Sequence, residues 1–195
     1  PGTYYEHLDL LGKEIHLRGL QGRDVTVVDG SSTGTVVTMT SGETLATALT
    51  GLTITHGAGV DGGGVFVQGA SATLSALSVV ENTATGLGGG LSLFETSASL
   101  HDMVISDNMS DADGGGIYLS DVQGAVLDGM TVTDNTTWDS GGGLSAHDGD
   151  LVISNSSFAR NESGWLGGGL ELYADTTISS IAVYDNVAPA GYGGG

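Results

Sequence analysis

One short segment of the chain brings imidazole and carboxylate groups together closely enough to suggest acid–base chemistry. His147 is followed directly by Asp148, and Asp150 lies two residues further on. An imidazole can take up and release a proton near neutral pH, as a general acid or base must do. His147, Asp148 and Asp150 are therefore the candidate catalytic residues. The alternative interpretation is an ordinary polar turn, and the sequence favours a chain without enzymatic activity.

A second set of acidic side chains could hold a metal ion. Asp113 directly precedes three glycines, whereas Asp107 and Asp134 each directly precede an asparagine. The candidate ligands are Asp107, Asp111, Asp113, Asp134 and Asp139. Carboxylates stacked at the spacing of neighbouring strands, about 5 Å, repel one another, and Ca²⁺ is a hard cation that takes six to eight oxygen ligands. A calcium site is thus one interpretation of this pattern, and a solvated acidic rim is the other.

Aromatic side chains recur after the glycine triplets at positions expected to point outward. Phe66 and Tyr118 belong to one row of such positions, and Phe94 and Tyr173 belong to the adjacent row. The flat, weakly polar face of an aromatic ring can stack on a sugar ring or on a protein partner. These four residues form the candidate carbohydrate or partner face, with a neutral surface as the alternative.

All of these residues lie within a chain that repeats itself. Glycine triplets begin at Gly62, Gly88, Gly114, Gly141, Gly167 and Gly193, with steps of 26, 26, 27, 26 and 26 residues. A second marker keeps the same phase, at Asn82, Asn108, Asn135, Asn161 and Asn186. Two markers in register over most of a chain indicate a solenoid, a propeller or an array.

Each repeat has room for two or three short strands and none for a helix. Apolar residues lie eight, five and three positions before the asparagine, apart from Ser156, and an apolar-x-apolar pattern follows the glycines. This alternation is typical of strands. A propeller blade needs about 40–50 residues, and the helical return of a leucine-rich repeat is missing. The sequence therefore predicts an all-β fold, a single-stranded parallel β-helix solenoid with about 26 residues per coil.

The coils are expected to form one solenoid over residues 1–195. Residues 1–56 would form the N-terminal coils, and residues 57–195 the regular ones. Neither end has a polar capping unit, which solenoids normally need, and this predicts that the natural chain continues beyond both ends. Exposed end coils carry unpaired strand edges, so end-to-end self-association is expected as well.

Both repeat markers have mechanical interpretations. Glycine adopts positive φ angles and leaves no side chain at a crowded corner. Asparagine tolerates left-handed turns, and its amide both donates and accepts hydrogen bonds. We predict that Asn82, Asn108, Asn135, Asn161 and Asn186 form a structural ladder along the solenoid axis.

Charge and composition exclude several functions. The formal net charge is −19, from 23 acidic and 4 basic residues, which argues against nucleic acid and anionic membranes as partners. No apolar run approaches about 18 residues, so no membrane insertion is expected within this segment. The chain has no cysteine and hence no disulfide.

The whole pattern resembles the right-handed parallel β-helix of pectate-lyase-like proteins. The resemblance rests on residues 1–6 (PGTYYE), on residues 25–30 (VTVVDG) and on the repeats. The glycine triplets and the apolar-x-x-Asn motif also resemble polymorphic outer-membrane protein repeats of autotransporter-type passenger domains, although only residues 158–161 (FARN) carry the phenylalanine of that motif.

The resemblance implies an extracellular or cell-surface protein with a structural or adhesive role. On this basis we expect a secreted segment, stabilised by Ca²⁺ and able to self-associate, that contacts a glycan or a surface protein. The alternative is a polysaccharide-active lyase or hydrolase, or a carbohydrate-binding module, on the same fold. Pectate-lyase-like enzymes use acidic Ca²⁺ ligands and a basic residue, and their hydrolytic relatives use paired aspartates.

Overall fold

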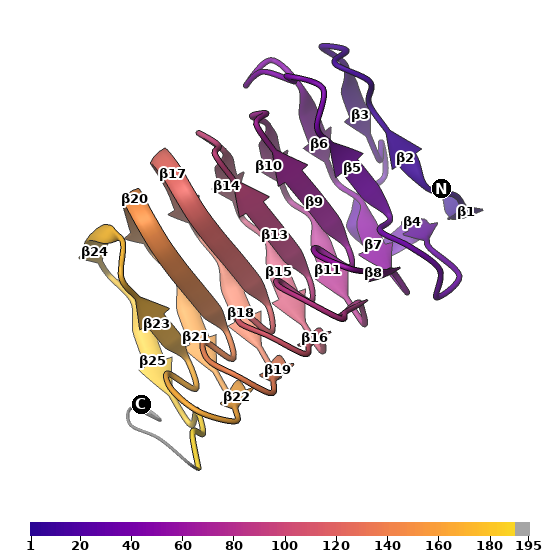
Figure 1. Ribbon diagram of the computed structural model, residues 1–195. Coiled ribbons are helices and arrows are strands. Elements are labelled where there is room, and N and C mark those ends of the chain that lie inside the picture. Colours follow the sequence, from indigo (N-terminus) through magenta and orange to yellow (C-terminus); the bar gives the residue numbers. More distant parts are fainter. Residues whose placement is uncertain (190–195) are drawn as a thin grey trace.

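The computed structural model describes residues 1–189, and it confirms the predicted parallel β-solenoid. The chain winds through successive coils that stack from the N-terminal end to the C-terminal end (Figure 1). Strands of neighbouring coils pair in parallel and build three sheets that run along the solenoid. Among the described residues, no helix is both long and apolar enough to cross a membrane.

The first sheet has eight strands, one from each coil, and most of them lie just before the ladder asparagines. Its strands are β1 (Gly2–Tyr5), β4 (Thr26–Asp29), β7 (Thr53–Thr55), β11 (Ser78–Val80), β15 (Val104–Ser106), β18 (Thr131–Thr133), β21 (Ser157–Ala159) and β25 (Ala182–Tyr184). A single turn of 3-10 helix, η1 (Arg23–Val25), leads into β4.

The second sheet has twelve strands and two halves. The half that follows the glycine corners contains β2 (Leu8–Asp9), β5 (Val37–Met39), β9 (Val65–Gln68), β13 (Leu91–Phe94) and β23 (Leu170–Leu172). The other half contains β3 (His16–Arg18), β6 (Ala48–Thr50), β10 (Thr73–Ser75), β14 (Ser99–His101) and β24 (Asp175–Ser179). Two long strands, β17 (Ile117–Asp128) and β20 (Leu144–Ser154), run through both halves.

The boundary between these halves, which we call the seam, is where the pairing changes register. Phe94 pairs with Ser120, 26 residues on, but Ser99 pairs with Val126, 27 residues on. The register of β17 against β20 shifts between Val122 and Ala125. The coil that contains β17 has one residue more than its neighbours, and this residue is accommodated at the seam.

The third sheet is short and follows the asparagines. Its strands are β8 (Ala58–Gly59), β12 (Thr83–Ala84), β16 (Met109–Ser110), β19 (Thr136–Thr137) and β22 (Glu162–Ser163).

The core consists of aliphatic columns enclosed by the sheets. Because parallel pairing places the same repeat position of successive coils side by side, one column contains Leu74, Leu100, Leu127 and Ile153, all fully buried. Burial of each such side chain contributes about 1.5–3 kcal/mol to the free energy of folding. The alternating strand pattern thus gives a continuous core, although no coil could bury its apolar side chains alone.

The predicted asparagine ladder is present along the corner between the first and third sheets. The Nδ2 of each asparagine donates to the Oδ1 of the next one, over distances of 2.9–3.0 Å from Asn82 to Asn186. A second Nδ2 hydrogen bond goes to a carbonyl of the preceding coil, as from Asn135 to Ile105 O at 2.9 Å. The backbone N–H of Asn108 also donates to Asn135 Oδ1, at 3.1 Å. Each buried amide inside the ladder is therefore fully hydrogen-bonded.

The left-handed residue at this corner is not the asparagine, as the sequence suggested, but the residue before it. Glu81, Asp107, Asp134, Arg160 and Asp185 have φ angles of 56–59°. This turn aims the asparagine side chain inward, where its amide meets the next coil. The acidic residues that precede the ladder are consequently part of the corner itself.

The glycine triplets provide the close approach that the ladder needs. Gly114 has φ 71°, which a side chain would strain. A Cβ on Gly116 would lie 2.7 Å from Gly143 O and 3.0 Å from Asn135 Cγ. The triplets therefore form tight corners packed against the ladder. The last triplet, from Gly193, lies outside the described residues.

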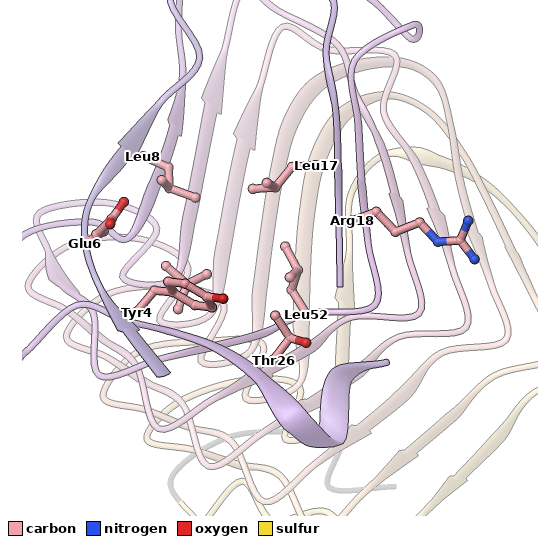
Figure 2. A pocket seen from close by; sticks show the side chains of 8 residues that line it. Tyr4, Glu6, Leu8, Leu17, Arg18, Thr26 and Leu52 are labelled. Carbon is pink, nitrogen blue, oxygen red and sulfur yellow. The ribbon is translucent and has the colours of Figure 1, made fainter. Parts of the chain in front are cut away.

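The N-terminal end of the solenoid has a pocket lined by the first coils. Leu8, Leu17 and Leu52 point into it, with the Tyr4 ring beside Leu52, while Arg18 points away (Figure 2). β1 pairs with β4 alone, so its other edge has no strand partner among the described residues. The end-to-end self-association predicted from the sequence would use this apolar surface, and it stays a prediction.

Removing one rung of the ladder should destabilise the whole solenoid. Asn135→Ala removes the Oδ1 that accepts from the N–H and Nδ2 of Asn108. It also removes the Nδ2 that donates to Ile105 O and Asn161 Oδ1. We expect the free energy of unfolding to fall by about 1–3 kcal/mol, because buried polar groups are left unpaired. Urea unfolding measures the loss. The control is Thr136→Ala, at the exposed neighbouring position, and equal midpoints for the two variants would contradict a buried ladder.

Candidate functional site on the outer face of the twelve-stranded sheet

Five rings stack across successive coils on the outer face of the strands that follow the glycine corners. We call them the aromatic row: Phe66, Phe94, Tyr118, His147 and Tyr173. The centroids of consecutive rings are 6.1, 5.3, 5.6 and 5.0 Å apart. These spacings are typical of edge-to-face and tilted aromatic pairs. The structure thus joins the four aromatic residues singled out in the sequence, and it adds His147 between two of them.

The rings of the row occupy two outward positions that lie two residues apart along the strands. Phe66 pairs with Ser92 on β13, while the ring that it contacts is Phe94, two residues further along that strand. Tyr118 pairs with Ser145, whereas it contacts His147, again two residues away. Such diagonal neighbours lie about 7–8 Å apart at the backbone, within reach of aromatic side chains. Small serines opposite the rings leave the space that this packing requires.

The rings are not equally accessible to solvent. Tyr118 is only 8% exposed, because Phe94 and His147 flank it and Gly114 lies against its Cβ. The sequence-based expectation that Tyr118 offers an open outward ring is therefore wrong, although its side chain does lie opposite the core residues of β17. Tyr173 is 64% exposed, and Phe66 and Phe94 are partly exposed.

Beside the row, three titratable side chains from successive coils meet. We call them the acid–histidine cluster: Asp113, His147 and Glu171. The Nε2 of His147 lies 3.7 Å from Glu171 Oε2 and 3.9 Å from Asp113 Oδ2. One potential ligand atom from each residue lies within 4.8 Å of the other two; Glu171 is 9% exposed, and Asp113 and His147 are partly exposed. No other group of three potential metal ligands this close occurs among residues 1–189.

Hydrogen bonds hold the carboxylates of this cluster in place. Ser145, which is fully buried, donates its hydroxyl to Glu171 Oε2 at 2.8 Å and lies 3.0 Å from His147 Nε2. The backbone N–H of Ser140 donates to Asp113 Oδ1 at 3.1 Å. The cluster is therefore positioned by the repeat backbone and by a buried hydroxyl.

Both carboxyl groups of the cluster are harder to ionise than usual. Burial raises the pKa of Glu171, and the neighbouring Asp113 charge adds to the rise, against the opposing Ser145 hydrogen bond. Burial likewise raises the pKa of Asp113, with a further contribution from the Asp139 charge. Desolvation and like charge both disfavour a carboxylate. A proton or a cation would relieve this cost.

The structure therefore gives His147 different partners from those suggested by sequence adjacency. Asp148 and Asp150 are exposed in the middle of β20, where Asp148 has φ 54°. The contacts of His147 come instead from Asp113, one coil earlier, and Glu171, one coil later. The repeat period carried the signal for this site, because one step of 26 residues brings Glu171 beside Ser145.

The aspartates predicted as calcium ligands are spread over several environments. Asp134 forms a two-pronged ion pair with Arg160, at 2.7 and 2.8 Å, which lowers the pKa of its carboxyl group. Asp107, Asp111 and Asp139 are exposed, and Asp113 belongs to the acid–histidine cluster. Calcium binding by the full set of five aspartates stays a prediction.

Two further histidine–carboxylate contacts lie outside the acid–histidine cluster, one of them on the other half of the twelve-stranded sheet. His56 Nδ1 is 3.0 Å from Asp29 Oδ2, and His56 Nε2 is 3.2 Å from Glu81 Oε2. His101 Nδ1 lies 4.0 Å from Asp128 Oδ2 at a partly exposed position.

Comparison with known proteins identifies the family. The family described as right handed beta helix region matches residues 33–195, and the chain therefore belongs to it. This confirms the handedness implied by the resemblance. The same comparisons found no match among curated proteins and none among solved structures.

The His56 contacts should make stability depend on pH. The hydrogen bond to Asp29 raises the pKa of His56. A histidine whose pKa is higher in the folded than in the unfolded chain stabilises the folded state. The full contribution is present below the ordinary histidine pKa of about 6.5, and it is lost as pH rises through the raised pKa. The test is the melting temperature of His56→Asn, since asparagine tolerates the positive φ of this position. It should be lower than that of wild type at pH 5, and the two melting temperatures should converge at pH 8. His16→Asn, at an exposed position without an ion pair among the described residues, is the control. A constant difference across this pH range would contradict the assignment.

Proposed function

We propose that this member of the right-handed β-helix family is a secreted or cell-surface segment that adheres to glycans through its aromatic row. The observation that carries the proposal is the row of stacked rings on one outer face, in which the buried Tyr118 supports its neighbours while Phe66 and Phe94 are partly exposed and Tyr173 is 64% exposed. Rings that already pack on one another lose little conformational freedom when a ligand binds, so their binding energy is not spent on ordering side chains.

The row is suited to an extended chain of sugars. Neighbouring coils lie about 4.8 Å apart, so the five rings follow the solenoid axis over several coils. Hydroxyl and carboxylate groups stand next to the rings, as Ser120 does beside Tyr118. Apolar ring faces with a few polar groups at their edges are typical of small-molecule and carbohydrate-sized sites.

Charge determines which glycans fit this face. The chain carries a net charge of −19, and Asp113 and Glu171 lie beside the row. Polyuronates would be repelled unless cations bridged them, because like charges disfavour association. We therefore propose neutral glycans as the ligands.

A second candidate function is cleavage of a polysaccharide, favoured by the acid–histidine cluster. Hydrolysis of a glycosidic bond uses a pair of carboxyl groups, one of them protonated, and the raised pKa values of Asp113 and Glu171 favour a protonated member of such a pair. Ser145 is fully buried and holds Glu171, so its hydroxyl is a positioning group and not a nucleophile.

Binding should depend on the exposed end of the row. We expect Tyr173→Ala to weaken binding to immobilised neutral glycans about tenfold, corresponding to ~1.4 kcal/mol, because a stacking surface is removed. The matched control is Tyr184→Ala, since Tyr184 is 46% exposed but lies on β25 of the eight-stranded sheet. Equal losses in the two variants, or binding of polyuronates alone, would contradict the proposal.

Turnover of the same glycans distinguishes adhesion from cleavage. If the chain is only a binding segment, long incubation releases no new reducing ends or unsaturated products. If it cleaves, Glu171→Gln should abolish product formation while binding through Tyr173 persists. The control is Asp150→Asn, at an exposed position away from the cluster. Product formation that survives Glu171→Gln would exclude the cluster as the catalytic site.

A further inference from the structure

We propose that Asp113, His147 and Glu171 form a binding site for a divalent transition metal ion of the zinc class. This site goes beyond the proposed glycan binding and does not depend on it. It also differs from the calcium site predicted from the sequence, because only Asp113 belongs to both sets.

The three side chains converge with the spacing of a metal site. His147 Nε2 lies 3.7 and 3.9 Å from the nearest oxygens of Glu171 and Asp113. Ligand atoms of a tetrahedral zinc ion, each about 2.0–2.1 Å from the metal, lie about 3.4 Å from one another. To bind zinc, the side chains must rotate inward from ligand-atom separations of up to 4.8 Å, and His147 Nε2 must exchange its 3.0 Å hydrogen bond with Ser145 for the metal, with its proton released or moved to Nδ1.

Each potential ligand is also held by a second contact. The His147 ring lies between Tyr118 and Tyr173, with centroids at 5.6 and 5.0 Å. The buried Ser145 hydroxyl donates to Glu171, and the Ser140 N–H donates to Asp113. Partners that orient the ligands in this way are typical of metal sites, and their loss lowers metal affinity.

The two carboxylates of the cluster have His147 as their only basic neighbour. Asp113 is partly shielded from water and Glu171 is largely buried, and no lysine or arginine of residues 1–189 forms a salt bridge with either of them. Arg160, the basic residue of the regular coils, instead pairs with Asp134. Buried charges are normally paired or bound to a metal. A bound cation would supply the missing charge.

The ligand set indicates which metals fit. Imidazole nitrogen suits Zn²⁺, Co²⁺ and similar ions, whereas Ca²⁺ and Mg²⁺ take oxygen ligands. Three protein ligands leave one position of a tetrahedral ion free for water, as in zinc sites that remain open. Because Asp113, His147 and Glu171 come from successive coils, the ion would also link three coils across the sheet.

The test is metal titration of the tag-free protein after treatment with a chelator. Isothermal calorimetry with Zn²⁺ should give one ion per chain, saturating zinc should raise the melting temperature, and Co²⁺ should give the visible absorption of a tetrahedral site. Glu171→Gln keeps the shape of the side chain and should weaken zinc binding more than tenfold. Ser145→Ala, which removes only the orienting hydroxyl, should weaken it about 10–100-fold.

Asp128→Asn is the matched control, because Asp128 faces His101 without a third ligand nearby. It should leave zinc affinity unchanged. The proposal is overturned if no saturable zinc binding occurs at micromolar concentration, if Ca²⁺ binds as tightly as Zn²⁺, or if Asp128→Asn loses as much affinity as Glu171→Gln. Circular dichroism checks that each variant is folded, and should Glu171→Gln not fold, Ser145→Ala and Asp113→Asn make the same distinction.

Discussion

The fold depends on one close approach, between the glycine corner of each coil and the asparagine amides behind it. Gly116 packs so tightly on Asn135 and Gly143 that no side chain fits there. The same amides connect the coils through hydrogen bonds in both directions along the axis. Because both features recur once in each regular coil, they keep the strands of these coils in phase with their neighbours. The aliphatic columns and the outer rows of side chains follow from that phase.

This periodicity explains why so much of the architecture could be predicted. The glycine triplets and the asparagines are required by the tight corner of the backbone, and each regular coil needs the same corner. The strands, the inward columns and the ladder were all predicted from that repeat. The prediction erred on the left-handed residue because Asn108 and Asp107 are both residue types that tolerate positive φ, and only the direction of the amide decides between them.

The site was harder to predict, since its residues occur once and the repeat does not report them. His147 next to Asp148 looked like a pair because the two are adjacent in sequence, but Asp148 is exposed at a left-handed position and no ion pair joins the two side chains among the described residues. The true neighbours of His147 lie about one period away, at Asp113 and Glu171. The burial of Tyr118 was also missed, because it depends on side-chain packing with Phe94 and His147 and not on the outward position of its own backbone.

The seam has a consequence for how such a chain can change over evolutionary time. The coil with one additional residue takes it up between Val122 and Ala125, and the coil that follows from β20 is one residue shorter past Ala146. In both coils the change in length leaves the ladder asparagines paired. The corner thus keeps its length while the seam takes up differences of one residue. Insertions at the seam could diversify the surface of the solenoid, one coil at a time, while the ladder stays paired.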